Sequence, residues 1–221
     1  MDKVIIIGAG TMGSMIATWF AQQKVNIEIY DVNSNLLESS KKAALQLWDK
    51  LEQKGKFSRE DKKAYQACFK TIHNLNEIDP TSDLVIEAIV EKLAPKIEIF
   101  NVIDRIVNSD CIFATNTSGL SIQDIKNSLP KKRQERFIGL HFFNPATIMK
   151  LVEVISCASQ VDISRELVSF FQDKGKVPVN CKDRPGFICN RIARNFYGEA
   201  LRISGSQDYG RLLDVDYIMR N

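Results

Sequence analysis

The sequence lacks several features that would set it apart from ordinary globular proteins. It has only 5 cysteines, at positions 68, 111, 157, 181 and 189, without a C-x-x-C pair. This pattern argues against a disulfide framework or a zinc site and predicts reduced thiols in the cytoplasm. No apolar run approaches the ~18 residues of a membrane-spanning helix. The first apolar stretch, residues 4–7, ends at Gly8, which predicts a buried strand rather than a signal peptide.

The chain also lacks a strong charge of either sign. Its 30 basic and 27 acidic side chains leave a net charge of +3 over 221 residues, which predicts no nucleic-acid partner. Hydrophobic residues make up 44% of the sequence, and such a chain buries enough apolar surface to offset the entropy lost on ordering. Long disorder is therefore not expected.

Strand-like and helix-like segments alternate along most of the chain, which predicts an α/β fold. The first strand, helix and second strand form a βαβ unit, which implies a parallel sheet. Residues 34–68 differ, because two charged helices separated by residues 54–58 predict a helical hairpin that projects from the sheet. The predicted strands are 4–7, 27–31, 69–73, 83–88, 111–116, 137–143, 150–155 and 177–181. The further predicted helices cover about 92–107, 163–175, 187–203 and 212–221.

The first strand is followed by Gly8-Ala9-Gly10-Thr11-Met12-Gly13, a G-x-G-x-x-G motif that opens a helix. In this context the glycines permit a tight turn, close approach of a pyrophosphate and close helix packing, and the helix N-terminus favours phosphate. Asp31 stands 18 residues after Gly13, at the end of the second strand. A carboxylate there accepts a ribose hydroxyl and repels a 2′-phosphate, so the pattern predicts NAD as cofactor. The alternative is a tight turn beside an exposed aspartate.

Two ionisable residues follow in strand-like segments. His141 precedes Phe-Phe-Asn-Pro where a strand is expected to end, and imidazole suits removal of a hydroxyl proton near neutral pH. Glu153 lies in the otherwise apolar segment 150–155, and a buried carboxylate requires a partner. The alternatives are a structural histidine and a glutamate on the solvated face of an edge strand.

With these residues the chain resembles the 3-hydroxyacyl-CoA dehydrogenase family, including its 3-hydroxybutyryl-CoA dehydrogenases. The resemblance runs from Gly8 to about Leu201 through four blocks: DLVIEAIVEKLAPK (83–96), ATNTSGLSI (114–122), GLHFFNPATIMKLVEVI (139–155) and DRPGFICNRI (183–192). It implies oxidation of a 3-hydroxyacyl-CoA by NAD, or the reverse reduction. It also implies a Rossmann-like NAD-binding domain, residues 1–183, and the beginning of an all-α C-terminal domain, residues 184–221, that forms a homodimer.

The resemblance also implies roles for individual residues. His141 is the catalytic base and Glu153 orients its ring, while Ser118 and Asn190 hold the substrate oxygen. Asn144 contacts substrate and nicotinamide. Glu91 and Lys96 lie near the nicotinamide ribose and carboxamide. Without the resemblance, the alternative for Ser118 is a helix N-cap, and the alternative for the two asparagines is a turn or helix-surface amide. Glu91 and Lys96 would then belong to a solvated helix face.

Two departures from the family pattern leave other functions open. Gly119 stands where the family usually has a second serine, and the family continues with further helices, so we expect a fragment or an early-terminated form. One alternative is a dehydrogenase of a free 3-hydroxy acid or a carnitine-like substrate. Another is a non-catalytic NAD-binding paralogue. Lys50, Lys54 and Lys56 in the hairpin could meet CoA phosphates, although a solvated charge run is the simpler interpretation.

Overall fold

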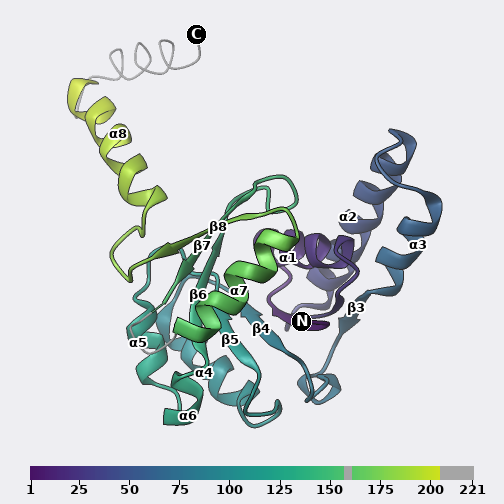
Figure 1. The fold of residues 1–221 in the computed structure, drawn as a ribbon, viewed down its shortest axis with the longest axis horizontal. Helices are drawn as coiled ribbons and strands as arrows, with labels where there is room; N and C mark the ends of the chain where they lie inside the picture. The colour runs from purple at the N-terminus through teal and green to yellow at the C-terminus, as the bar shows by residue number, and fades with distance from the viewer. Residues whose placement is uncertain (157–160, 205–221) are drawn as a thin grey trace.

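The computed structural model describes residues 1–156 and 161–204. Within them, eight strands form one sheet in the order β3-β2-β1-β4-β5-β6-β7-β8 (Figure 1). The strands are β1 (Lys3–Ile7), β2 (Asn26–Tyr30), β3 (Phe69–Ile72), β4 (Leu84–Glu87), β5 (Ile112–Thr115), β6 (Phe137–Phe142), β7 (Leu151–Ile155) and β8 (Val177–Cys181). The predicted helix at 212–221 lies outside the described residues.

Helices cover both faces of the sheet. They are α1 (Thr11–Gln22), α2 (Ser34–Gln53), α3 (Arg59–Ala67), η1 (Leu75–Glu77), α4 (Leu93–Ile103), α5 (Ile122–Asn127), α6 (Lys131–Gln134), α7 (Val161–Asp173) and α8 (Cys189–Ser204). Phe20 of α1, Trp48 of α2 and Phe171 of α7 pack in one buried cluster, and Phe100 of α4 and Ile125 of α5 pack in another. The apolar strands are buried between these two layers, as a sheet with helices on both faces requires.

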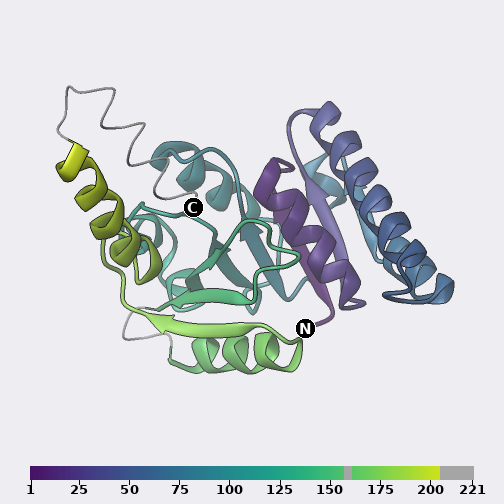
Figure 2. The ribbon, with the colours of Figure 1, turned by 90° about the horizontal axis from the view of Figure 1, so that it is seen from above.

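The predicted helical hairpin is present as α2 and α3. Ser58 and Asp61 form a capping box at the start of α3, which explains why the chain resumes a helix there. The hairpin is attached to the core by one face of α2 that includes Leu37 and Trp48. Figures 1 and 2 show it projecting at the end of the molecule opposite α8.

The sheet is not wholly parallel. Strands β6 and β7 pair antiparallel, with His141 opposite Glu153, and β8 then runs parallel to β7. The parallel pairing predicted from the first strand–helix–strand unit is confirmed at β1 and β2. At β6 and β7 the direction changes, because residues 143–150 are a short connection without a crossover helix. Sequence reasoning also missed the short helices α5 and α6.

Helix α8 leaves the sheet after the Pro-Gly segment and extends away from it (Figure 2). Phe187, just before it, is buried and has a φ of 48°. Among the described helices, none is long and apolar enough to cross a membrane.

Candidate active site

The glycine-rich loop connects β1 to α1 in a turn too tight for side chains at two positions. Gly8 has a φ of 106°, and a Cβ on it would lie 2.6 Å from the carbonyl oxygen of Ala88. A Cβ on Gly13 would lie 1.9 Å from the carbonyl oxygen of Gly8. Packing within the chain thus accounts for both glycines.

Gly10 is different, because the fold does not require it. It is the N-cap of α1 with a φ of −67°, and a Cβ there would meet no atom within 4 Å. The open space faces the N-terminus of a helix, where Thr11 is exposed and backbone N–H groups favour an anion. Packing within the chain therefore does not explain why this residue is a glycine. Close contact between a ligand phosphate and the backbone explains it, because a side chain would stand in the way.

A cleft of about 760 Å³ opens beside this loop, at the ends of β1, β2 and β4. Exposed Val32, Leu36 and Val102 contribute to its apolar lining. Asp31 lies at its edge, where one carboxylate oxygen accepts from the N–H of Ala9 at 2.7 Å and the other from Asn33 at 2.9 Å. Asp31 therefore holds the glycine-rich loop as well as facing the cleft, with lone pairs left for ribose hydroxyls.

A second cleft, of about 380 Å³, lies at the ends of β4, β5 and β6. It brings together most of the residues predicted for chemistry from five separate parts of the chain. Its lining includes Met12, Glu91, Asn116, Ser118, His141, Asn144 and Asn190. The two clefts share Ala88 and Ile89, which follow β4.

His141 and Glu153 form a close pair between β6 and β7. Nδ1 of His141 lies 2.7 Å from Oε2 of Glu153, and Glu153 is buried. The other oxygen, Oε1, accepts from the N–H groups of Ile188 and Cys189 at 2.9 and 2.8 Å. Burial raises the pKa of Glu153, but the bonds from His141 and from these N–H groups outweigh it, so the net pKa is lowered. The solvated-glutamate alternative is wrong.

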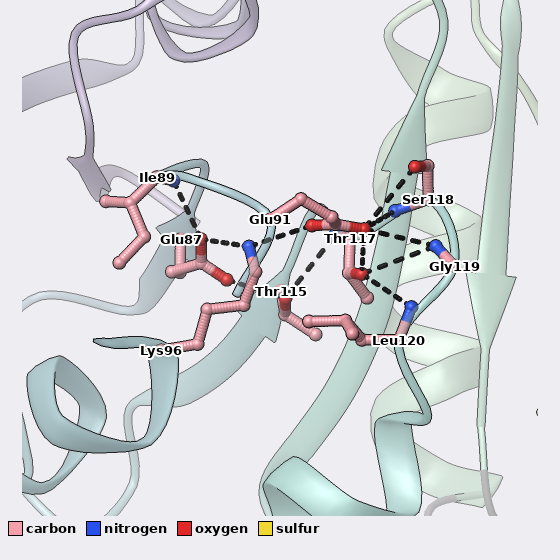
Figure 3. A network of polar contacts seen from close by, with 9 residues as sticks. All are labelled: Glu87, Ile89, Glu91, Lys96, Thr115, Thr117, Ser118, Gly119 and Leu120. Carbon is pink, nitrogen blue, oxygen red and sulfur yellow. Dashed lines mark hydrogen bonds and ion pairs between the residues drawn. The ribbon is translucent and has the colours of Figure 1, made fainter. Parts of the chain in front are cut away.

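Lys96 is buried rather than part of a solvated helix face, whereas Glu91 is exposed and lies just before α4; Figure 3 shows their contact. The Lys96 side chain is only 1% exposed, and its Nζ lies 2.5 Å from Oε1 of Glu87 and 3.3 Å from Oε2 of Glu91. Lys96 itself lines neither cleft, so its predicted contact with the cofactor stays a prediction. Glu91 lines the small cleft and accepts from the N–H groups of Ser118 at 2.9 Å and Gly119 at 3.2 Å.

Ser118 is exposed in the small cleft and is not a helix N-cap. That position belongs to Ser121, whose hydroxyl accepts from the N–H of Asp124 at the start of α5. Asn190, on α8, donates from Nδ2 to the carbonyl oxygen of Ser118 at 3.5 Å. The loop after β5 and helix α8 therefore meet at this cleft.

Sequence reasoning missed Glu87 and Asn116. Glu87 is fully buried at the end of β4, and Asn116 accepts from the N–H of Phe142 at 2.9 Å, which ties the end of β5 to β6. Both had a signal: an acidic residue ending an apolar strand, and an asparagine directly after one. Within the described ranges, no cluster of His, Cys, Asp and Glu could hold a metal ion.

Comparison with known proteins decides the family. The NAD-binding domain of 3-hydroxyacyl-CoA dehydrogenase matches residues 3–184. The chain belongs to the 3-hydroxyacyl-CoA dehydrogenase family. It is thus an NAD-dependent oxidoreductase with a Rossmann-like fold, and the large cleft, Gly10 and Asp31 fit the cofactor that this family uses.

Individual members of the 3-hydroxyacyl-CoA dehydrogenase family are similar over most of the chain. The mitochondrial hydroxyacyl-coenzyme A dehydrogenase of Rattus norvegicus is 39% identical over 100% of this chain and 71% of its own length. A probable 3-hydroxybutyryl-CoA dehydrogenase of Bacillus subtilis is 35% identical over 91% of this chain and 69% of its own. The crystal structure of 3-hydroxybutyryl-CoA dehydrogenase from Escherichia coli has a TM-score of 0.86 at 34% identity, covering 91% of this chain and 42% of that one.

Proposed function

We propose that this protein catalyses the NAD-dependent oxidation of a 3-hydroxyacyl-CoA to a 3-oxoacyl-CoA, or the reverse reduction, with His141 as the general base. The observation that carries the proposal is the His141–Glu153 pair, 2.7 Å apart, beside Ser118 and Asn144 in the small cleft. A buried carboxylate against Nδ1 holds the proton on that nitrogen and leaves Nε2 as the acceptor for a substrate proton.

In the oxidative direction, Nε2 of His141 takes the proton of the C3 hydroxyl as the C3–H bond breaks. The bound cofactor supplies the hydride acceptor. Glu153 stabilises the resulting imidazolium, and the Ser118 hydroxyl donates to the substrate oxygen. Asn144 and Asn190 place uncharged amides near the thioester. A proton and a hydride thus leave the alcohol together, which balances the reaction.

The proposed partners are an acyl-CoA substrate and a second copy of the chain. The acyl-CoA thioester enters the small cleft, and α8 is the beginning of a helical domain through which the protein forms a homodimer. Exposed Ile188, Ile192 and Phe196 on and just before α8 support such an interface.

The test is a steady-state comparison of substrates at fixed NADH. Absorbance of NADH should fall with acetoacetyl-CoA, and much more slowly with free acetoacetate or dehydrocarnitine at equal concentration. His141→Gln is the control, since it should remove turnover while leaving NADH binding. Equal rates with the free acids would contradict an acyl-CoA substrate and indicate a free oxo acid instead. Unchanged turnover in His141→Gln would remove the proposed base.

A further inference from the structure

Glu87 is a fully buried carboxylate with no part in the proposed proton transfer. It ends β4, the strand next to β1 at the centre of the sheet. Its Oε1 lies 2.5 Å from Nζ of Lys96 and accepts from the N–H of Ile89 at 2.7 Å, while Oε2 accepts from the hydroxyl of Thr115 at 2.7 Å. Such complete pairing compensates for the desolvation of the charges, but it leaves unexplained why charges are buried there at all.

Lys96 joins this carboxylate to a second one. Its ammonium group lies between Glu87 and Glu91, as Figure 3 shows. Burial raises the pKa of Glu91, but the Thr117 hydroxyl and the Lys96 charge lower it by a larger amount. The net pKa is therefore lowered, and Glu91 is ionised at neutral pH. The cluster of Glu87, Lys96 and Glu91 holds two negative charges and one positive charge. Its net charge is therefore −1, and Glu91 brings it to the wall of the small cleft.

The position of the two clefts indicates which end of the cofactor meets this charge. The strand order reverses between β1 and β4, and dinucleotides lie across such a point. Asp31 places the adenosine half in the large cleft. The other half then lies past Ala88 and Ile89, in the cleft that contains His141 and Glu91. The next step rests on the proposed function. Hydride transfer requires the nicotinamide ring next to the substrate carbon at His141, so the ring lies beside the cluster.

We propose that the cluster of Glu87, Lys96 and Glu91 sets the relative affinity of the protein for the oxidised and reduced cofactor. The nicotinamide ring is positively charged in NAD⁺ and neutral in NADH, whereas the rest of the molecule is the same. A net negative cluster therefore stabilises bound NAD⁺ over bound NADH. Glu87 supplies the charge that makes the cluster negative, since Lys96 and Glu91 alone would cancel.

The test measures the dissociation constants of NAD⁺ and NADH separately by calorimetry, without substrate. Glu87→Gln keeps the size and an acceptor oxygen but makes the cluster neutral, so the affinity for NAD⁺ relative to that for NADH should fall about three- to tenfold. Adding Lys96→Met to Glu87→Gln leaves only Glu91 charged and restores the net −1. The double variant should therefore regain most of the original preference, although it removes one more polar group.

A merely structural role predicts the opposite result, because a second lesion in the same buried network should weaken binding of both forms further. An unchanged ratio in folded Glu87→Gln, or a double variant that moves further from the wild-type ratio, would overturn the proposal. Glu28→Gln is the matched control, since Glu28 also pairs with a lysine on a neighbouring strand, Lys70 at 2.8 Å, but lines neither cleft. The ratio of the dissociation constants of NAD⁺ and NADH in Glu28→Gln should equal that of the wild type.

Two further measurements keep the outcomes separate. If Glu87→Gln does not fold, Glu91→Gln removes the same unit charge from a partly exposed side chain and should lower the ratio in the same direction. Because the binding measurements need no substrate, they stand apart from turnover. Loss of acyl-CoA turnover with a normal ratio would count against the proposed function alone, and an unaltered ratio in variants that turn over normally would count against the cluster alone.

Discussion

The two clefts are lined by different kinds of chemical group. The large cleft is formed by glycine backbone, the two acidic residues Asp31 and Glu98, and apolar side chains such as Val32 and Val102. The small cleft is formed by polar side chains from the ends of β4, β5 and β6 together with α8. The large cleft therefore binds by shape and backbone, while the small cleft depends on individual charges and hydrogen bonds. Substitutions should separate accordingly into effects on affinity and effects on rate.

The largest expected effect is on rate alone. His141→Gln should lower kcat by about 10²–10⁴-fold, because it removes the proposed general base, while NADH affinity changes little since the large cleft is intact. Stopped-flow turnover and fluorescence titration of NADH measure the two quantities. A parallel loss of both would mean that the clefts are not functionally separate.

In the glycine-rich motif, Gly13 and Gly10 should respond differently to alanine. Gly13→Ala places a Cβ 1.9 Å from the Gly8 carbonyl oxygen and should reduce the free energy of unfolding by about 3 kcal/mol or more. Gly10→Ala meets no atom of the chain and should leave stability within about 1 kcal/mol. Its effect should fall on NADH affinity instead. Chemical denaturation and titration of both variants check this contrast, which a stable Gly13→Ala would contradict.

Glu153→Gln should lower kcat by about 10–100-fold, as expected for a residue that orients a catalytic group. Because the pair acts as a unit, the double variant with His141→Gln should lose little more than His141→Gln alone. Steady-state rates of the two single variants and the double variant form the cycle. Losses that multiply would show that the two side chains act independently.

Asp31→Ala should reduce the preference for NAD⁺ over NADP⁺ by about tenfold, since a charged acceptor for the ribose is lost. The same change removes the bond to the N–H of Ala9, so both cofactors should bind somewhat more weakly. Dissociation constants for the two cofactors measure the ratio. Equal affinities in the unmutated protein would contradict the role of Asp31.

The smallest expected effect is on acid stability. The pKa of Glu153 is lowered in the folded state, so its ionisation stabilises the fold above the pKa of the unfolded chain, and this is lost as pH falls through the lower folded value. The difference in unfolding free energy between wild type and Glu153→Gln should therefore shrink on acidification. Urea titrations between about pH 7 and pH 3 test this, and a constant difference would contradict it.

The sequence predicts the fold well where local signals and packing agree. The glycine motif and the buried strands each depend on a few neighbouring residues, and the structure has them where expected. The antiparallel pairing of β6 with β7 does not follow from the apolar pattern of either strand. Its signal is the short connection between the predicted strands 137–143 and 150–155, which leaves no room for the crossover that a parallel pair requires.

The candidate site was predictable to a lesser depth. His141 and Glu153 stood out because each is a polar residue in an apolar strand, and they lie together as the resemblance implied. Lys96 did not stand out, since a lysine on a helix is usually solvated and only its buried partner Glu87 explains its burial. Glu87 and Lys96 are only nine residues apart, but one ends a strand and the other lies on a helix, so their contact depends on how the helix packs against the sheet.

Glu153 has one consequence for how this protein could be divided into modules. One of its oxygens faces the ring of His141 and the other holds the N–H groups of Ile188 and Cys189. A cut after residue 183 would leave that second oxygen without its donors, beside the histidine that it orients. The smallest unit that could be exchanged between relatives, or grafted onto another helical domain, therefore includes the first turn of α8. An exchange made at the Pro-Gly segment would have to bring a matching pair of backbone donors to the same carboxylate.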